Sequence, residues 1–407
     1  MKLNPTVVAR GLVKHWNYFS HHIIASPGMA HPMQACFEEA YVVMGAARTM
    51  PLLDDARMTT IGRAFNSRMM KFQGVHHPDM FDMGYGYEFD EKGLVNCSCV
   101  ADNASTANGM LEVVRVFPHL PENPQVLASV KRYIDHCLKH YLTDKGVMGV
   151  GILNHKSNPE GMKEYWCADS LFAAVLINYA DLSGETRYYD VAVPLIEYIS
   201  TFDYKKTLWE EWTKAAPQQI LLYTGEGLVA ALKSKEMKRR LAVPLQNVIQ
   251  FSPKAEPEKR VPAQAPNLVE NELKSANTVA GHTIWDRLQS RWAEFGDWLH
   301  HNQMADGSFE HPANDHFRCY EPGLSWLLLE AAHGIDGCAW LESIAAKQLR
   351  FMAGDGGKLY YGLRANDFAS GLALLSFATA GEMLKQRDPV AWEAAIQGVF
   401  DRGEEIW

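Results

Sequence analysis

Acidic residues recur along this sequence in one local setting, at the start of a stretch that is apolar on nearly every side. Asp169 is the clearest case, because a loop with aromatic residues precedes it and an apolar run continues from it to Asp181. Carboxyl groups that gather in one site are suited to general acid and base catalysis. The six positions are Glu38 or Glu39, Asp102, Asp169, Glu226, Glu321 and Asp367.

The elements that would position these acids alternate between two kinds of helix. A helix that is apolar all round is typical of a fully buried position, whereas residues 5–20, 54–71 and 186–200 have helical patterns with a polar face. Successive acids are 63 or 64, 67, 57, 95 and 46 residues apart. The sequence therefore predicts an all-α fold, an (α/α)6 barrel of six inner and six outer helices. Strand-like loops such as 93–97 would lie at its mouth.

The longest interval contains a charged, proline-rich run near residues 252–280. Proline removes a backbone donor and clashes with the preceding turn, so this run does not continue a helix. The helical pattern resumes after it. We therefore expect an insertion in a single domain that covers residues 1–407.

Composition excludes several classes of function. The 407 residues are 47% hydrophobic and 21% charged, as expected of a globular protein with a large core. The net charge of −9 does not favour a nucleic-acid partner. We identify neither a stretch of 18 apolar residues nor an export signal, so a membrane partner is not expected. Seven scattered cysteines fit a reducing compartment, which predicts a cytoplasmic protein. A homo-oligomer remains open.

Each acid taken alone has a simple structural explanation, because a carboxylate at a helix N-terminus complements the helix dipole. A ring of six is harder to explain in this way, since six inner N-termini would converge on one mouth. Like charges would repel there, and the carboxyl pKa values would rise. Such a site suits acid and base chemistry on a neutral or sugar substrate, which predicts an oligosaccharide as the partner.

Cations and aromatic side chains near the acids are candidates for substrate binding. Arg318 and Arg364 each precede a ring acid by three residues, and His316 lies in a neighbouring loop. These cations would hold a uronate carboxylate, and aromatic rings would stack on sugar faces. The predicted substrate-binding residues are Glu38, Glu39, Trp166, Glu226, His316, Arg318, Tyr320, Glu321, Tyr361, Arg364 and Asp367.

The sequence gives little support for a metal or another cofactor. The pair His76 and His77 and the pair Cys97 and Cys99 lack a complete set of ligands at tetrahedral spacing. Cysteines that lie two residues before a ring acid are predicted to be small buried side chains. These are Cys36, Cys167 and Cys319.

Two segments resemble the six-hairpin glycosidases, in particular the unsaturated glucuronyl and unsaturated rhamnogalacturonyl hydrolases. They are residues 166–172, continued downstream by 179–188, and Asp102 with Asn103 one repeat earlier. The resemblance implies that Asp169 is the catalytic acid and base and that Asp102 is its partner. It leaves both saturated and unsaturated uronates open as substrates.

The leading hypothesis is a hydrolase that removes a terminal uronic acid from oligosaccharides. A polysaccharide lyase on the same barrel would use Tyr320 or His316 as its base. A sugar epimerase and a non-catalytic binding toroid are further alternatives.

Overall fold

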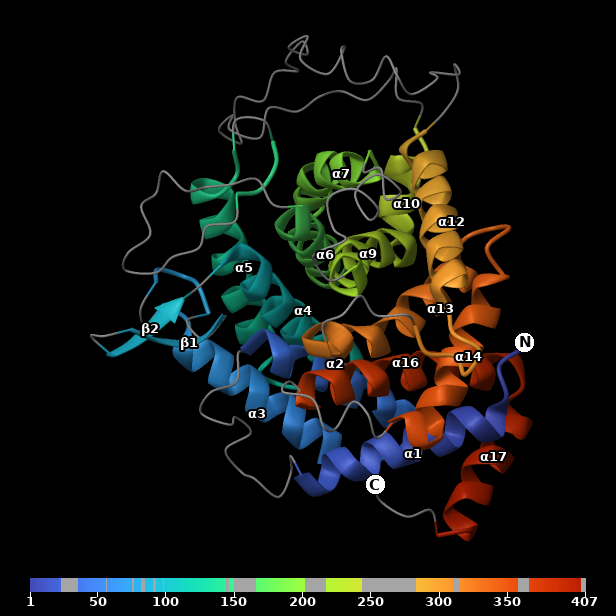
Figure 1. Ribbon diagram of the computed structural model, residues 1–407. Coiled ribbons are helices and arrows are strands. Elements are labelled where there is room, and N and C mark those ends of the chain that lie inside the picture. The colour runs from blue at the N-terminus through green and yellow to red at the C-terminus, as the bar shows by residue number, and fades with distance from the viewer. Residues whose placement is uncertain are drawn as a thin grey trace.

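The computed structural model describes residues 1–22, 36–55, 57–74, 77–81, 85–90, 93–97, 99–143, 146–149, 166–201, 217–243, 283–309, 315–357 and 366–403. Within these ranges the chain is almost entirely helical, as the apolar and amphipathic repeats predict. The helices form two concentric layers around one axis (Figure 1).

The inner layer is a closed ring of helices, each packed against the next. In ring order they are α2 (Cys36–Leu53), α4 (Val100–Val116), α6 (Trp166–Ser183), α9 (Pro217–Lys233), α13 (Leu324–Gly334) and α16 (Asn366–Arg387). Helix α16 packs against α2 and closes the ring. The 3₁₀ helix η4 (Asp315–Gly323) leads directly into α13 and also contacts α9 and α16.

The outer helices lie around this ring, and most of them pack directly on an inner helix. They are α1 (Pro5–His22), α3 (Arg57–Phe72), α5 (Asn123–His140), α7 (Arg187–Ser200), α12 (Ile284–Asn302) and α14 (Leu341–Ala353). Helix α17 (Pro389–Asp401) packs on α1 and α16, and the short α10 (Lys235–Leu241) packs on α9. In α5 and α12 the buried positions follow the helical spacing. The predicted (α/α)6 barrel is confirmed.

A two-stranded antiparallel sheet accompanies the helices at the mouth. Strand β1 (Tyr85–Asp90) pairs with β2 (Gly93–Cys97), and β1 lies beside α2. The predicted strand-like segment 93–97 is therefore confirmed. The insertion expected near 252–280 lies outside the described residues, and the assignment of the chain to one domain stays a prediction. Among the described helices, none is long and apolar enough to cross a membrane.

The prediction that Glu226 begins a helix is wrong. Helix α9 begins at Pro217, so Glu226 lies more than two turns inside it. The glycines on either side of Glu226 resemble a loop in the sequence, but they have a packing role. A Cβ atom on Gly227 would lie 2.5 Å from the backbone oxygen of Ser170 in α6. The absence of a side chain therefore lets α9 approach α6 closely.

Candidate active site

Asp102 lies in the first turn of α4, at a helix start that is held by several hydrogen bonds. Cys99 is the N-cap residue, and its sulfur accepts a hydrogen bond from the Asp102 backbone amide at 3.3 Å. The Cys99 thiol in turn donates to Asp102 Oδ2 at 2.9 Å. Thr106 Oγ1 donates to the Asp102 carbonyl oxygen at 3.0 Å. The Asp102 side chain is thus fixed in position at the N-terminus of an inner helix.

The environment of Asp102 raises its pKa into the neutral range. Burial raises the pKa of the carboxyl group, the Cys99 thiol lowers it, and the negative charge of Glu38 raises it again, to about 7 in all. The residue is 9% exposed, so it is largely shielded from water. A carboxyl group with a pKa near neutrality is able to act as a general acid at physiological pH.

Three other inner elements, one adjacent to α4 and two across the ring, bring side chains toward Asp102. They are Glu38 from α2, Tyr223 from α9 and Tyr320 from η4, and Asp102 or Glu38 influences the titration of both tyrosines. Burial raises the pKa of Tyr223 and of Tyr320 well above the usual range. We call Glu38, Asp102, Tyr223 and Tyr320 the mouth layer, because these side chains are linked by the electrostatic influence that they have on one another around Asp102.

A second layer lies one helical turn below the mouth layer, three residues further along each chain segment. Tyr41 donates a hydrogen bond to Glu226 Oε1, and the Tyr41 hydroxyl also lies 3.2 Å from Ser105 Oγ. Burial raises the pKa of Glu226 and the Tyr41 hydroxyl lowers it, to about 8 in all. We call Tyr41, Ser105 and Glu226 the middle layer, and it forms the floor beneath Asp102.

Ion pairs close the opposite end of the barrel, seven residues beyond the middle layer. Arg48 Nε donates to Glu112 at 2.7 Å, and its Nη1 donates to Glu330 at 2.9 Å. Lys233 donates to the same oxygen of Glu330 at 2.9 Å. We call Arg48, Glu112, Lys233 and Glu330 the far layer. Because oppositely charged side chains are paired there, the cost of burying each charge is offset.

Aromatic rings join the inner helices near the mouth. Phe368 of α16 contacts Phe37, Tyr41 and Tyr320 edge-on, with ring centroids 5.1 to 6.1 Å apart. Tyr320 also contacts Tyr223 edge-on at 5.6 Å. Edge-to-face contacts of this kind favour a fixed arrangement of rings. Tyr320 is the half-buried member of this group, and it is therefore the one that is partly accessible to a substrate.

The six predicted acids are not equivalent, because two of them hold the loops between helices. Asp169 is fully buried, and its Oδ1 accepts a hydrogen bond from the Met148 amide at 2.7 Å. Glu321 Oε1 accepts from the Phe309 amide at 3.0 Å. In the repeat that contains Asp102, the acceptor is its neighbour Asn103, which binds the Phe81 amide at 2.6 Å. Each donor residue forms an isolated β-bridge with the preceding segment.

Glu39 points away from the mouth layer. It is buried and forms an ion pair with Arg68 of the outer helix α3. Its neighbour Glu38 is half-buried and belongs to the mouth layer. The structure thus separates two adjacent acids that the sequence pattern left as alternatives.

Several predicted binding residues lie wholly or partly outside the described part of the chain. Tyr361 and Arg364 fall within residues 358–365, which the structure does not describe. For four others only the backbone is described, in α6, η4 and α16. They are Trp166, His316, Arg318 and Asp367. Their roles in substrate binding stay predictions.

Two of the three cysteines that precede a ring acid agree with the sequence expectation. Cys167 and Cys319 are buried, as predicted, and Cys99, Cys137 and Cys338 are also buried and free. Among the described residues, no group of three or more His, Cys, Asp or Glu side chains is arranged to hold a metal ion. His76 and the Cys97 side chain lie outside the described part.

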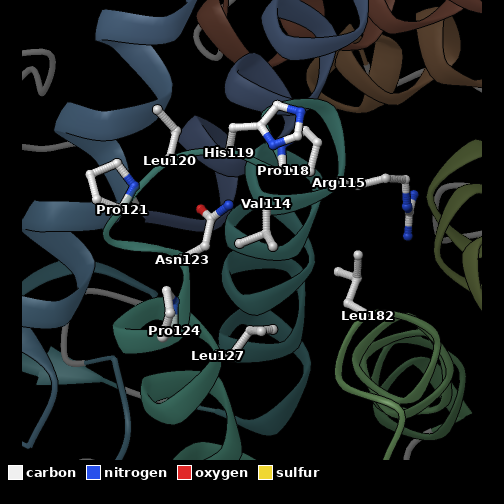
Figure 2. Close-up of a pocket in the computed structure, with 10 residues that line it drawn as sticks. All are labelled: Val114, Arg115, Pro118, His119, Leu120, Pro121, Asn123, Pro124, Leu127 and Leu182. Atoms are coloured by element: carbon white, nitrogen blue, oxygen red, sulfur yellow. The ribbon is translucent and has the colours of Figure 1, made fainter.

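A pocket lies at the opposite end of α4 from Asp102 (Figure 2). Val114 and Arg115 end α4 there, Asn123 and Pro124 begin α5, and Leu182 lies at the end of α6. The lining is mainly apolar. Arg115, its cationic member, is paired with Glu112 and donates a hydrogen bond to Asn178. The pocket therefore does not contain the mouth carboxyl groups.

Most of the site residues that sequence reasoning missed lie at regular intervals along the inner helices. Tyr41, Ser105, Tyr223 and Cys99 were not selected, although the first three occupy the inner positions of their helices. The same spacing recurs in four inner segments. Three residues after each mouth-layer residue comes the position of the middle layer, and seven residues after that comes a charged residue of the far layer. This spacing of three and seven keeps side chains on one helix face and is visible in the sequence.

Comparisons with known proteins agree with this architecture. No protein-family model matches the chain, and no curated protein matches it in sequence. A solved structure of a polysaccharide lyase is similar in fold, with a TM-score of 0.56 and 10% sequence identity. The match covers 93% of this chain and 97% of that chain. At this identity the likeness shows the fold.

Proposed function

We propose that this protein is a carbohydrate-active hydrolase that removes a terminal uronic acid, saturated or unsaturated, from oligosaccharides. One observation carries the proposal: Asp102, with a pKa of about 7, is held at the mouth of the barrel beside the carboxyl group of Glu38. Glycoside hydrolysis commonly uses two carboxyl groups, one that donates a proton and one that remains charged. Asp102 and Glu38 are proposed to supply this pair.

In this proposal Asp102 is the general acid and Glu38 is the second carboxylate. On a saturated uronoside, Asp102 gives its proton to the glycosidic oxygen as the bond to the anomeric carbon breaks. Glu38 accepts a proton from the water that adds to that carbon. On an unsaturated uronoside, Asp102 protonates the ring double bond, water adds to the resulting cation, and the water passes its proton to Glu38. The hemiketal formed in this way opens the ring and leaves a hemiacetal at the anomeric carbon, which breaks its bond to the glycosidic oxygen and releases the second sugar as an alcohol. Both routes consume one water molecule.

The assignment of the acid differs from the one that the glycosidase resemblance implies. That resemblance points to Asp169, which is completely buried and accepts a hydrogen bond from the Met148 amide. A carboxyl group in this setting holds a loop in place and has no exposed surface to offer a substrate. Asp102 lies near Glu38 and Tyr320, whose side chains are half-buried and therefore partly accessible.

A polysaccharide lyase is the second candidate. The name of the structurally similar protein supports it, and Tyr320 at the mouth would be the base that removes a proton next to the uronate carboxylate. Burial raises the pKa of Tyr320 well above its usual range, so a tyrosinate is strongly disfavoured at neutral pH. For this reason the hydrolase is preferred.

Product analysis separates the two candidates. The protein is incubated with a saturated uronoside, an unsaturated uronoside and a polyuronate, while ultraviolet absorbance and released sugar acid are followed. A hydrolase releases sugar acid from either uronoside and lowers the absorbance of the unsaturated one. A lyase raises the absorbance of the polyuronate, because it forms a new double bond. That rise without release of sugar acid would reject the hydrolase.

A further inference from the structure

Cys99 and Asp102 form a reciprocal pair of hydrogen bonds at the start of α4. The Asp102 amide donates to Cys99 Sγ at 3.3 Å, and the Cys99 thiol donates to Asp102 Oδ2 at 2.9 Å. Serine, threonine, aspartate and asparagine are the usual residues at a helix N-cap. A thiol performs the same task with a weaker donor and a weaker acceptor. The pair joins a cap directly to the carboxyl group at the mouth.

The helices around Asp102 bring few other partners to its carboxyl group. Glu38 faces it from α2 and affects its pKa. Tyr133 of α5, Tyr223 of α9 and Tyr320 of η4 carry hydroxyl groups that sense its charge. Arg68 of α3 pairs with Glu39, and Asp169 of α6 accepts a hydrogen bond from the Met148 amide. Among the hydrogen bonds of the described part of the chain, the one that a side chain makes to the Asp102 carboxyl group comes from Cys99.

We propose that Cys99 is a positioning residue that fixes the Asp102 carboxyl group and sets the pH at which Asp102 loses its proton. A donor to the charged carboxylate stabilises that form, and a weak donor stabilises it less than a hydroxyl group does. The thiol thus leaves Asp102 protonated to a higher pH than the usual serine cap would. The role of Cys99 in catalysis rests on the proposed function, but its effect on ionisation does not.

Two substitutions of Cys99 test whether the hydrogen bond that its thiol donates to Asp102 sets the pKa of the Asp102 carboxyl group. Cys99→Ser keeps a cap and supplies a stronger donor, whereas Cys99→Ala removes the donor. The pH midpoint of Asp102 ionisation is measured in the full chain by carbon NMR of labelled aspartate, with Asp102→Asn to assign the signal. We expect midpoints in the order alanine above cysteine above serine, with steps of roughly 0.5 pH unit or more.

Matched substitutions at Cys338 control for the loss of a buried thiol. Cys338 is buried between α13 and α14, and Cys338→Ser and Cys338→Ala are expected to leave the Asp102 midpoint unchanged. An equal midpoint in the three Cys99 forms, or the reverse order, would overturn the proposal. If the midpoints follow the expected order while no uronoside is cleaved, the positioning role stands and the proposed function fails.

Discussion

The hydroxyl group of Tyr41 donates a hydrogen bond to Glu226 across the axis of the barrel. Tyr41 lies on α2 and Glu226 on α9, which are opposite each other in the ring of inner helices. The bond closes the interior one turn below Asp102. A substrate that enters from the mouth would therefore meet this floor, and the reacting bond would lie at the level of Glu38, Asp102, Tyr223 and Tyr320.

The buried carboxyl group of Glu226 makes the folded protein less stable as the pH rises. Burial raises the pKa of Glu226 to about 8, so the folded form keeps a proton that the unfolded chain loses above about 4.5. Stability is then lost as the pH rises from about 4.5 to about 8. Glu226→Gln keeps an acceptor for Tyr41 and removes this cost.

We expect Glu226→Gln to raise the free energy of unfolding at pH 8 by on the order of 2 kcal/mol and to change it little at pH 4. Urea titrations at both pH values measure this difference. Glu393→Gln, on an exposed side chain, is the control. An equal effect of Glu226→Gln at both pH values would contradict the assigned titration.

The far layer has the opposite dependence on pH. Burial would raise the pKa of Glu112, but the charges of Arg115, Arg48 and Lys233 together lower it to about 2. Glu330 is likewise lowered to about 2, by Lys233 and Arg48 against burial. Both groups contribute stability that is present above the unfolded pKa and is lost as the pH falls toward 2.

Arg48→Met is expected to destabilise the fold by about 3–5 kcal/mol at pH 7, because Glu112 and Glu330 then lack their shared buried partner. The loss should be smaller at pH 3, where the carboxyl groups that have lost Arg48 take up protons more readily. The exposed pair of Arg63 with Glu122 supplies the control, since Arg63→Met should cost less than about 1 kcal/mol. Similar losses in the two variants would argue against a structural ion-pair network.

Asp169 is expected to act through its hydrogen bond to Met148, and two substitutions test this. Asp169→Asn retains an oxygen acceptor and should leave the thermal midpoint nearly unchanged. Asp169→Ala leaves the buried Met148 amide without its acceptor and should cost about 1–3 kcal/mol. The measurement is thermal denaturation followed by circular dichroism. If both substitutions destabilise equally, the negative charge and not the acceptor is what matters.

Close packing of α16 on α2 depends on Gly371. A Cβ atom there would lie 2.7 Å from both the backbone nitrogen and the Cα of Val42, so the two helices would have to separate. Gly371→Ala is expected to lower the free energy of unfolding by about 1–3 kcal/mol. At Gly398 the nearest atom is the Arg402 guanidinium at 3.5 Å, and Gly398→Ala should raise stability by up to about 1 kcal/mol. Denaturant unfolding of both variants checks the contrast.

The barrel could be predicted because its signal repeats in the sequence. The run from Asp169 to Asp181 is apolar on all sides and lies inside α6, and the helix expected at 186–200 is α7, which begins at Arg187. Asp388 followed by Pro389 is a helix-start signal in the sequence, and the Asp388 side chain accepts a hydrogen bond from the Ala391 amide at the start of α17. Helical periodicity and capping depend on residues that are close together in the sequence, so they can be predicted without knowledge of the fold.

The candidate site was harder to predict because the direction of a side chain depends on tertiary contacts. Glu38 and Glu39 are neighbours in the chain, yet one faces Asp102 and the other pairs with Arg68 of α3. Asp169 matches the glycosidase motif, but the loop that carries Met148 folds onto it. A sequence motif indicates where a helix begins, but the position of an acidic side chain depends also on the loops that pack against it, as Met148 does against Asp169.

The central claim is that Asp102, and not Asp169, transfers the proton in uronoside cleavage. The most direct test measures kcat for Asp102→Asn and Asp169→Asn on the uronoside that the parent protein cleaves. Loss of a general acid should lower kcat by roughly 10²- to 10⁴-fold in Asp102→Asn, while Asp169→Asn should stay within about tenfold of the parent. A large loss in Asp169→Asn together with near-normal turnover in Asp102→Asn would contradict the account.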